Sequence, residues 1–231
     1  METIELGNGQ YLLRFDCGVD DFFYSRPGGL FAAEAFKAAV HRHWVNAIVL
    51  YGPNGCGKTH LVKGFFGDYM RLYPNRKAAM MSAERFVQEL LQAIREKRQG
   101  AFYEKYGSCQ LLILDDAFCL KGKADTQRKT GEIFQRIAAS GGLAVIIFDE
   151  EVPPVYKEFW RAVEYGIEKS IACDLSLPDE GCRRAYARSI AKAEMPALPE
   201  GLAERFAQEL KTMSQIRATM QKHALEDRIN D

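Results

Sequence analysis

One glycine-rich segment constrains the fold of this chain more than any other feature: Gly52-Pro53-Asn54-Gly55-Cys56-Gly57-Lys58-Thr59. It has the spacing G-x-x-x-x-G-K-[S/T] and lies between an apolar run of strand type, 47–51, and a stretch that can form a helix, 61–70. In that setting the glycines allow backbone N–H groups to surround a phosphate, and the helix N-terminus adds partial positive charge. We expect Lys58 to reach the β- and γ-phosphates and the Thr59 hydroxyl to ligate Mg²⁺. The alternative is a turn that only happens to end in Lys-Thr, which the flanking strand and helix disfavour.

Two acidic residues follow another apolar run. Residues 111–114 are all apolar, which is typical of a strand buried on both faces of a parallel sheet, and Asp115 and Asp116 come next. In open α/β sheets ligands bind at the carboxyl ends of the strands. We therefore expect Asp115 to hold Mg²⁺ through water and Asp116 to polarise the attacking water. The alternative is a strand that ends in an Asp-rich turn, and the phosphate loop upstream disfavours it.

The composition predicts one large domain, or one domain with a small appendage. The chain has 231 residues, 47% of them hydrophobic, and its 31 Lys and Arg balance its 31 Asp and Glu. A net charge near zero argues against strong nonspecific attraction to nucleic acid or to acidic membranes. No apolar stretch approaches the ~20 residues of a membrane span, and the first residues lack the pattern of a signal peptide. None of the six cysteines forms a C-x-x-C pair, so we expect reduced thiols and a cytoplasmic location.

Apolar runs alternate with helical segments along most of the chain. The runs are 47–51, 78–81, 111–114, 143–148 and 171–173. This alternation predicts an α/β fold with a five-stranded parallel sheet and helices on both faces. After Pro178 the segments 180–194, 200–211 and 213–226 have helical character. We therefore predict a base domain over residues 1–177 and a small helical lid domain over 178–231.

Several landmarks, in order, resemble the ATPase domain of the bacterial DnaA family. They are Gly52 to His60, Ser82 to Phe86, Phe102 to Tyr106, Leu111 to Asp116, Gly122-Lys123, Phe148-Asp149, Pro178 to Arg183, and Ile216-Arg217. The resemblance runs from about residue 15 to residue 225 and implies an AAA+ P-loop NTPase fold, with ATP or ADP and Mg²⁺ between base and lid. It also implies that Gly52 to His60 contact the nucleotide, although His60 itself is expected to pack or cap locally. Arg217 would reach the γ-phosphate from the lid, and Asp149 would help to order the attacking water.

Three departures from the family pattern bear on function. The chain stops at Asp231, where the family continues into a helix-turn-helix domain, so no reading of duplex sequence is expected. Asp125 stands where the family has a basic contact to single strands, so only weak single-stranded DNA contact is expected. Ala162 stands at the family's arginine-finger position, with Arg161 one residue early. Arg161 either pairs with an acid on its own helix, such as Glu158 or Glu164, or still acts in trans.

DnaA-like ATPases without the duplex-reading domain resemble the Hda type of regulator, which docks on the sliding clamp and inactivates DnaA. Such proteins carry a clamp-binding peptide of the form Q-[LI]-x-L-x-[LF], and this chain agrees with it at Gln10, Leu13 and Phe15. An edge strand, or a segment that packs on the base, is an equally weighted alternative.

The resemblance therefore implies an ATP- or ADP-binding protein of the DnaA/Hda type that acts in the initiation of chromosomal DNA replication or in its regulation. DnaA, the sliding clamp and further copies of the chain are its candidate partners. Two alternatives stay open: a helicase-loader-like ATPase, and a nucleotide-gated binding module with negligible turnover. The insertion from Glu84 to Phe102 favours the DnaA branch over the loaders.

Overall fold

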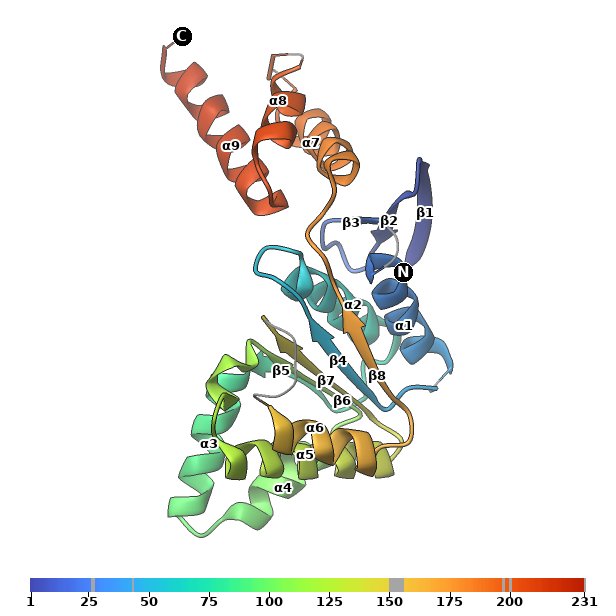
Figure 1. Cartoon of the computed structure of the whole chain (residues 1–231), viewed down its shortest axis with the longest axis vertical. Coiled ribbons are helices and arrows are strands. Elements are labelled where there is room, and N and C mark those ends of the chain that lie inside the picture. Colours follow the sequence, from blue (N-terminus) through green and yellow to red (C-terminus); the bar gives the residue numbers. More distant parts are fainter. Residues whose placement is uncertain (26–27, 43, 150–155, 197, 200, 231) are drawn as a thin grey trace.

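The computed structural model describes residues 1–25, 28–42, 44–149, 156–196, 198–199 and 201–230. Along these residues the chain builds an α/β base, a small N-terminal sheet beside it, and a group of helices at the C-terminal end (Figure 1). No helix in the described part is both long enough and apolar enough to pass through a bilayer.

A five-stranded parallel sheet forms the centre of the base, as predicted. Its strands are β4 (Ala47–Tyr51), β5 (Ala78–Ser82), β6 (Leu111–Asp115), β7 (Leu143–Phe148) and β8 (Ser170–Asp174), in the order β5-β6-β7-β4-β8. The register aligns Tyr51 with Phe148 and Ser82 with Asp115. The strand β4, which leads into the phosphate loop, and the strand β6, which leads into the acidic pair, therefore end at the same edge of the sheet.

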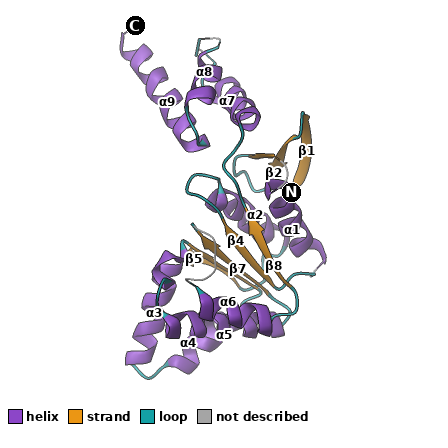
Figure 2. Ribbon diagram, in the orientation of Figure 1, coloured by secondary structure: helices purple, strands orange, loops and turns teal. Residues whose placement is uncertain are grey.

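Helices cover both faces of this sheet (Figure 2). Successive side chains of a strand point to opposite faces, so Ile48 and Leu50 pack in one apolar cluster while Ala47 and Val49 pack in another. The first cluster is closed by α1 (Gly28–Arg42) and α2 (Lys58–Leu72). The second is closed by α3 (Ala83–Arg95), α4 (Gln99–Gly107), the 3₁₀ helix η1 (Ala117–Leu120), α5 (Ala124–Ala139) and α6 (Lys157–Gly166). This double burial explains why the strands read as continuous apolar runs.

A three-stranded antiparallel sheet, which the sequence analysis did not predict, precedes α1. It consists of β1 (Glu2–Gly7), β2 (Gln10–Arg14) and β3 (Phe22–Ser25), with β2 in the centre. The Phe15 ring, just after β2, lies against α2 so closely that a Cβ added at Gly64 would come within 2.4 Å of it. The sheet is thereby fixed to the base through its central strand.

The position of β2 contradicts the interpretation of Gln10, Leu13 and Phe15 as a clamp-docking peptide. Leu13 is 0% exposed and Phe15 is 5% exposed, because both side chains belong to the core of the base. A docking peptide must present its side chains to the pockets of a partner, and these two are already packed. The packing alternative is confirmed, although β2 is the central strand rather than an edge.

The C-terminal helices form a third apolar cluster of their own. They are α7 (Glu180–Glu194), α8 (Leu202–Glu209) and α9 (Met213–Asn230), close to the predicted helical segments. The Asp179 side chain accepts a hydrogen bond from the Cys182 N–H (2.7 Å) and so caps α7. Phe23 of β3 packs edge-on against Tyr186 of α7, with ring centroids 5.6 Å apart. The N-terminal sheet therefore touches both the base and the lid helices.

Candidate functional site

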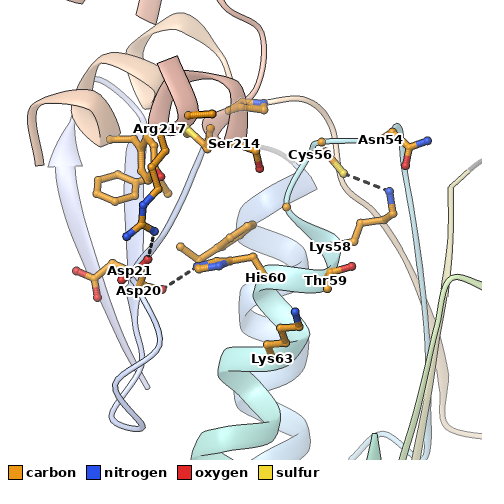
Figure 3. Close-up of a pocket in the computed structure, with 18 of the residues that line it drawn as sticks. Asp20, Asp21, Asn54, Cys56, Lys58, Thr59, His60, Lys63, Ser214 and Arg217 are labelled. Atoms are coloured by element: carbon orange, nitrogen blue, oxygen red, sulfur yellow. Dashed lines mark hydrogen bonds and ion pairs between the residues drawn. The ribbon is translucent and has the colours of Figure 1, made fainter. Parts of the chain in front are cut away.

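A cleft of about 510 Å³ lies where the base, the N-terminal sheet and the lid helices meet. Three stretches line most of it: Asp20 to Phe23, the phosphate loop from Asn54 to His60, and the first turns of α9, from Met213 to Gln221 (Figure 3). Its volume falls within the range of small-molecule sites, which is roughly 300–1,000 Å³. The cleft opens at the carboxyl ends of the parallel strands, where ligands bind in α/β folds.

At two positions of the phosphate loop, backbone conformation and close neighbours require glycine. Gly57 begins α2 with φ of 98°, and a Cβ there would lie 2.7 Å from the Phe22 ring. Gly55 has φ of 84°, and a Cβ there would lie 2.4 Å from the Thr212 side chain. Positive φ is costly for residues with a Cβ. The loop is therefore held directly against the N-terminal sheet on one side and against the start of the lid helix α9 on the other.

Lys58 lies at the centre of the loop and is 5% exposed. Its Nζ donates to the carbonyl oxygens of Gly52 (2.7 Å) and Pro53 (2.9 Å) and forms an ion pair with Asp149 Oδ1 (3.0 Å). A buried ammonium group requires such partners. Nζ also lies 3.8 Å from Cys56 Sγ. Burial raises the pKa of the Cys56 thiol, although the charge of Lys58 acts in the opposite direction. Cys56 is therefore a protonated packing residue of the loop.

Asp149 directly follows β7 and faces the phosphate loop. With the Asn54 amide oriented so that its nitrogen points at Asp149, that group donates to both carboxylate oxygens, at 3.0 and 3.2 Å. Asp149 thus joins Lys58 and Asn54 at the end of the neighbouring strand, beside the loop, as its sequence position suggested. Its role toward an attacking water stays a prediction.

Thr59 and Asp115, the two residues predicted to hold Mg²⁺, lie in direct contact. The Thr59 Oγ1 donates to Asp115 Oδ1 at 3.2 Å, and the Asp116 N–H donates to the same oxygen at 2.9 Å. Mg²⁺ is usually held by one or two carboxylates together with waters and substrate phosphates, so this hydroxyl–carboxylate pair fits it. Across the described residues, no three His, Cys, Asp or Glu side chains are grouped to hold an ion. Phosphate and water oxygens would have to complete the coordination.

Asp116 is exposed and has φ of 54°, in the left-handed region. That conformation is uncommon for a residue other than glycine and is found preferentially at functional sites. Neither Asp115 nor Asp116 lines the cleft itself, and Asp115 reaches it through Thr59. The acidic pair therefore borders the phosphate loop on the sheet side, and the proposed catalytic role of Asp116 stays a prediction.

His60 lines the cleft and also fixes the N-terminal segment in place. Its Nε2 lies 2.7 Å from the Asp20 carbonyl oxygen. A carbonyl can only accept, so Nε2 carries the proton in this contact. The ring also stacks on Phe22, with centroids 6.2 Å apart. These contacts agree with the expected local packing role.

Arg217 enters the cleft from α9 and is held by two carboxylates. One terminal nitrogen lies 2.5 Å from Asp20 Oδ2 and the other 2.5 Å from Glu194 Oε1. Figure 3 shows the side chain directed at Asp20. The family resemblance predicts Arg217 at the nucleotide, but no sequence pattern predicted its two acidic partners or the wall from Asp20 to Phe23. The only available signal was the unusual run of two acids and two phenylalanines, which matches no motif.

Arg161 pairs with Glu158 on its own helix at 3.2 Å, the contact that the local alternative predicts, and its action in trans stays untested. The neighbouring Ala162 faces α5, where a Cβ added at Gly131 would lie 2.4 Å from the Ala162 Cβ. The family's finger position therefore points into the α5–α6 contact, while Arg161 points to solvent.

Comparison with known proteins agrees with this geometry. Residues 22–168 match the sequence model of the bacterial DnaA ATPase domain. The chromosomal replication initiator protein DnaA of a Thermotoga species is 30% identical over 180 residues, which are 77% of this chain and 41% of that protein. The chain thus spans about two fifths of the length of the curated relatives it matches.

Solved structures have the same fold. Domain III of the Thermotoga maritima replication initiation protein DnaA superposes with a TM-score of 0.77 at 26% identity, over 88% of this chain and 86% of that one. A replication initiator DnaA bound to AMPPCP and single-stranded DNA gives 0.72 at 22% identity, over 88% and 65%. The DnaC helicase loader gives 0.53 at 15% identity, over 67% and 93%, a likeness of fold alone. Because the family match spans most of the base domain, the chain belongs to the bacterial DnaA ATPase domain family.

Proposed function

We propose that this protein binds ATP or ADP with Mg²⁺ in the cleft between an α/β base, residues 1–177, and a helical lid, residues 178–231. The observation that carries the proposal is the convergence on one phosphate loop of the buried Lys58 ammonium and the Thr59–Asp115 pair. Both lie at the N-terminus of α2, where backbone N–H groups favour an anion. The likeness to a DnaA bound to AMPPCP supports the same ligand class.

Each group would have a distinct part. The loop from Gly52 to His60 would surround the phosphates and Lys58 would neutralise them, exchanging part of its contact with Asp149 (3.0 Å) for phosphate oxygens. Thr59 and Asp115 would hold Mg²⁺, whose chemistry is to bridge phosphate oxygens and offset their charge. Asp116 and Asp149 would orient a water toward the γ-phosphate, and Arg217 would approach that phosphate from the lid.

Nucleotide titration of the wild-type protein tests the proposal. Isothermal titration with ADP and with AMPPCP should show one site per chain, and EDTA should weaken the triphosphate analogue more than ADP, because Mg²⁺ held by Thr59 and Asp115 would offset the larger charge of the triphosphate. Absence of heat and of any melting-temperature shift at millimolar concentrations of both ligands would rule out the nucleotide site.

Hydrolysis should be slow, because no arginine at position 162 is available to act on a neighbouring subunit. A working finger is worth about 10³–10⁵ in rate, whereas Arg161 is occupied by Glu158. The Arg161→Ala variant should therefore hydrolyse ATP within about twofold of the wild-type rate, with little dependence on protein concentration. A hundredfold loss in a phosphate-release assay, with steep concentration dependence in the wild type, would instead establish Arg161 as a finger acting in trans.

The role we propose is in the initiation of chromosomal replication or its regulation, in the cytoplasm, with DnaA or further copies of the chain as partners. Family membership supports this role. The helices α3 and α4 occupy the insertion that favours the DnaA branch over helicase loaders. Clamp docking through Gln10, Leu13 and Phe15 is not part of the proposal, because Leu13 and Phe15 are buried.

DNA binding should be weak and indifferent to duplex sequence. The chain carries no net charge, and Asp125 pairs with Arg128 at 3.2 Å, so this acid neutralises a nearby cation. Specific protein–DNA complexes usually reach about 10⁻⁸ M or tighter at physiological salt. Fluorescence anisotropy at 150 mM salt should give dissociation constants weaker than about 10⁻⁵ M for duplexes. Nanomolar affinity for an origin duplex over scrambled sequence would contradict this expectation.

A further inference from the structure

Three parts of the chain that are far apart in sequence meet at the Arg217 guanidinium. Asp20 comes from the segment before β3, Glu194 from the last residue of α7, and Arg217 from α9. The guanidinium uses one terminal nitrogen for each carboxylate, and both distances are 2.5 Å. The side chains of Arg217 and Glu194 are 33% and 32% exposed, and that of Asp20 is 48% exposed. This group is one cation between two anions and has a net charge of −1.

The arrangement creates a competition for Arg217. A guanidinium presents a planar fork of donors that suits a carboxylate or a phosphate equally well. Each terminal nitrogen keeps a second N–H, but the two carboxylates fix the direction of the guanidinium, so turning it toward a γ-phosphate in the same cleft would lengthen at least one of the two ion pairs. A nucleoside diphosphate has no γ-phosphate, and its terminal phosphate remains at the loop. Its binding therefore does not require Arg217 to move.

We propose that Asp20 and Glu194 are positioning residues that restrain Arg217 and thereby set the preference of the site between ATP and ADP. This inference rests on the proposed nucleotide site. The two acids lower the affinity for the triphosphate relative to the diphosphate, and the protein releases Arg217 only when the γ-phosphate outcompetes them. Asp20 has a second link to the site, because its backbone carbonyl accepts from His60 (2.7 Å).

Neutral isosteres separate this role from a structural one. Asp20→Asn and Glu194→Gln keep size and backbone contacts but remove one charge each. We expect each to raise the ratio of the ADP to the AMPPCP dissociation constant by about three- to fivefold, the upper range for a partly exposed ion pair. Asp21→Asn is the matched control: it also lines the cleft and removes the same charge, but its carboxylate faces Arg14 (3.5 Å) rather than Arg217. Its ratio should equal that of the wild type.

The decisive comparison is made in an Arg217→Ala background. There, Asp20→Asn should no longer change the ratio, because the carboxylate acts only through the arginine. Three results would overturn the inference. The ratio of the two dissociation constants could stay unchanged in both Asp20→Asn and Glu194→Gln, or it could change equally in Asp21→Asn. The effect of Asp20→Asn on the ratio could also persist in the Arg217→Ala background. If the wild type binds both ligands and the ratio does not respond, only this inference fails. If the wild type binds neither ligand, the nucleotide site itself is disproved and the inference with it.

Discussion

Lys58→Ala should abolish the rise in melting temperature that Mg-ATP or Mg-ADP produces in the wild-type protein. A ligand at about 100 times its dissociation constant stabilises the native state by roughly 2.7 kcal/mol, which is about 5–10 °C for a domain of this size. Lys58 is the cation of the loop that is both buried and directed at the carbonyl groups around the phosphate position. Its removal should weaken either nucleotide by at least about a hundredfold, the loss expected for a charge-assisted contact in a desolvated site.

Lys63→Ala provides the matched control for charge. Lys63 also lines the cleft but lies exposed on α2, past the loop, so its loss should change the dissociation constants by less than about threefold. Differential scanning fluorimetry, with and without nucleotide, measures the melting-temperature shift of both variants. Equal effects of the two substitutions would mean that nucleotide affinity comes from the general charge of the cleft and not from the loop.

Phe15→Ala should destabilise the fold by about 3–5 kcal/mol, because truncating a buried phenylalanine removes apolar contacts and leaves a cavity. The ring is 5% exposed and fills the space beside Gly64 of α2. Urea unfolding followed by circular dichroism measures the change, and the melting temperature should fall by roughly 10 °C.

Phe31→Ala is the natural reference for that experiment, since Phe31 is 52% exposed on α1. The same truncation there should change the free energy of unfolding by less than about 0.5 kcal/mol. A Phe15→Ala variant as stable as Phe31→Ala would show that residues 10–15 leave the base readily, and clamp docking by this segment would then have to be reconsidered.

The centre of the parallel sheet could be predicted because its strands β4, β6 and β7 are buried on both faces. Double burial demands an unbroken apolar run, such as Leu143–Phe148, and such runs are the clearest strand signal in a sequence. The lid helices could be predicted equally well from the sequence, because Pro178 and helical periodicity delimit them. In both regions local pattern and tertiary packing require the same residues.

The N-terminal sheet could not be found in that way. The outer strand β1 is mostly exposed and β3 has four residues, so neither produces a long apolar run. One signal was available: Asn8-Gly9, between two alternating segments, is the dipeptide typical of a tight hairpin, and both residues have positive φ, at 52° and 77°. The partnership of β2 and β3 depends on contacts with α2 and α7, which no local pattern encodes.

The same distinction between local pattern and tertiary contact applies to the residues of the candidate site. The loop and the acidic pair carry their chemistry in consecutive residues, and the structure brings Thr59 to within 3.2 Å of Asp115. The wall from Asp20 to Phe23 and the pairing of Arg217 with Asp20 bring together residues distant in sequence. Only the docking of the lid against the N-terminal sheet creates them.

The close contact between α5 and α6 also limits how this protein could change. At Gly131 and Ala162 the two helices approach so nearly that a methyl group on the first would overlap the methyl group of the second. A codon change that placed arginine at position 162 would therefore force the helices apart before it could supply any catalytic group. An arginine at position 162 is thus incompatible with this packing, whereas a change at Glu158 would free the solvent-facing Arg161 without disturbing the helix contact.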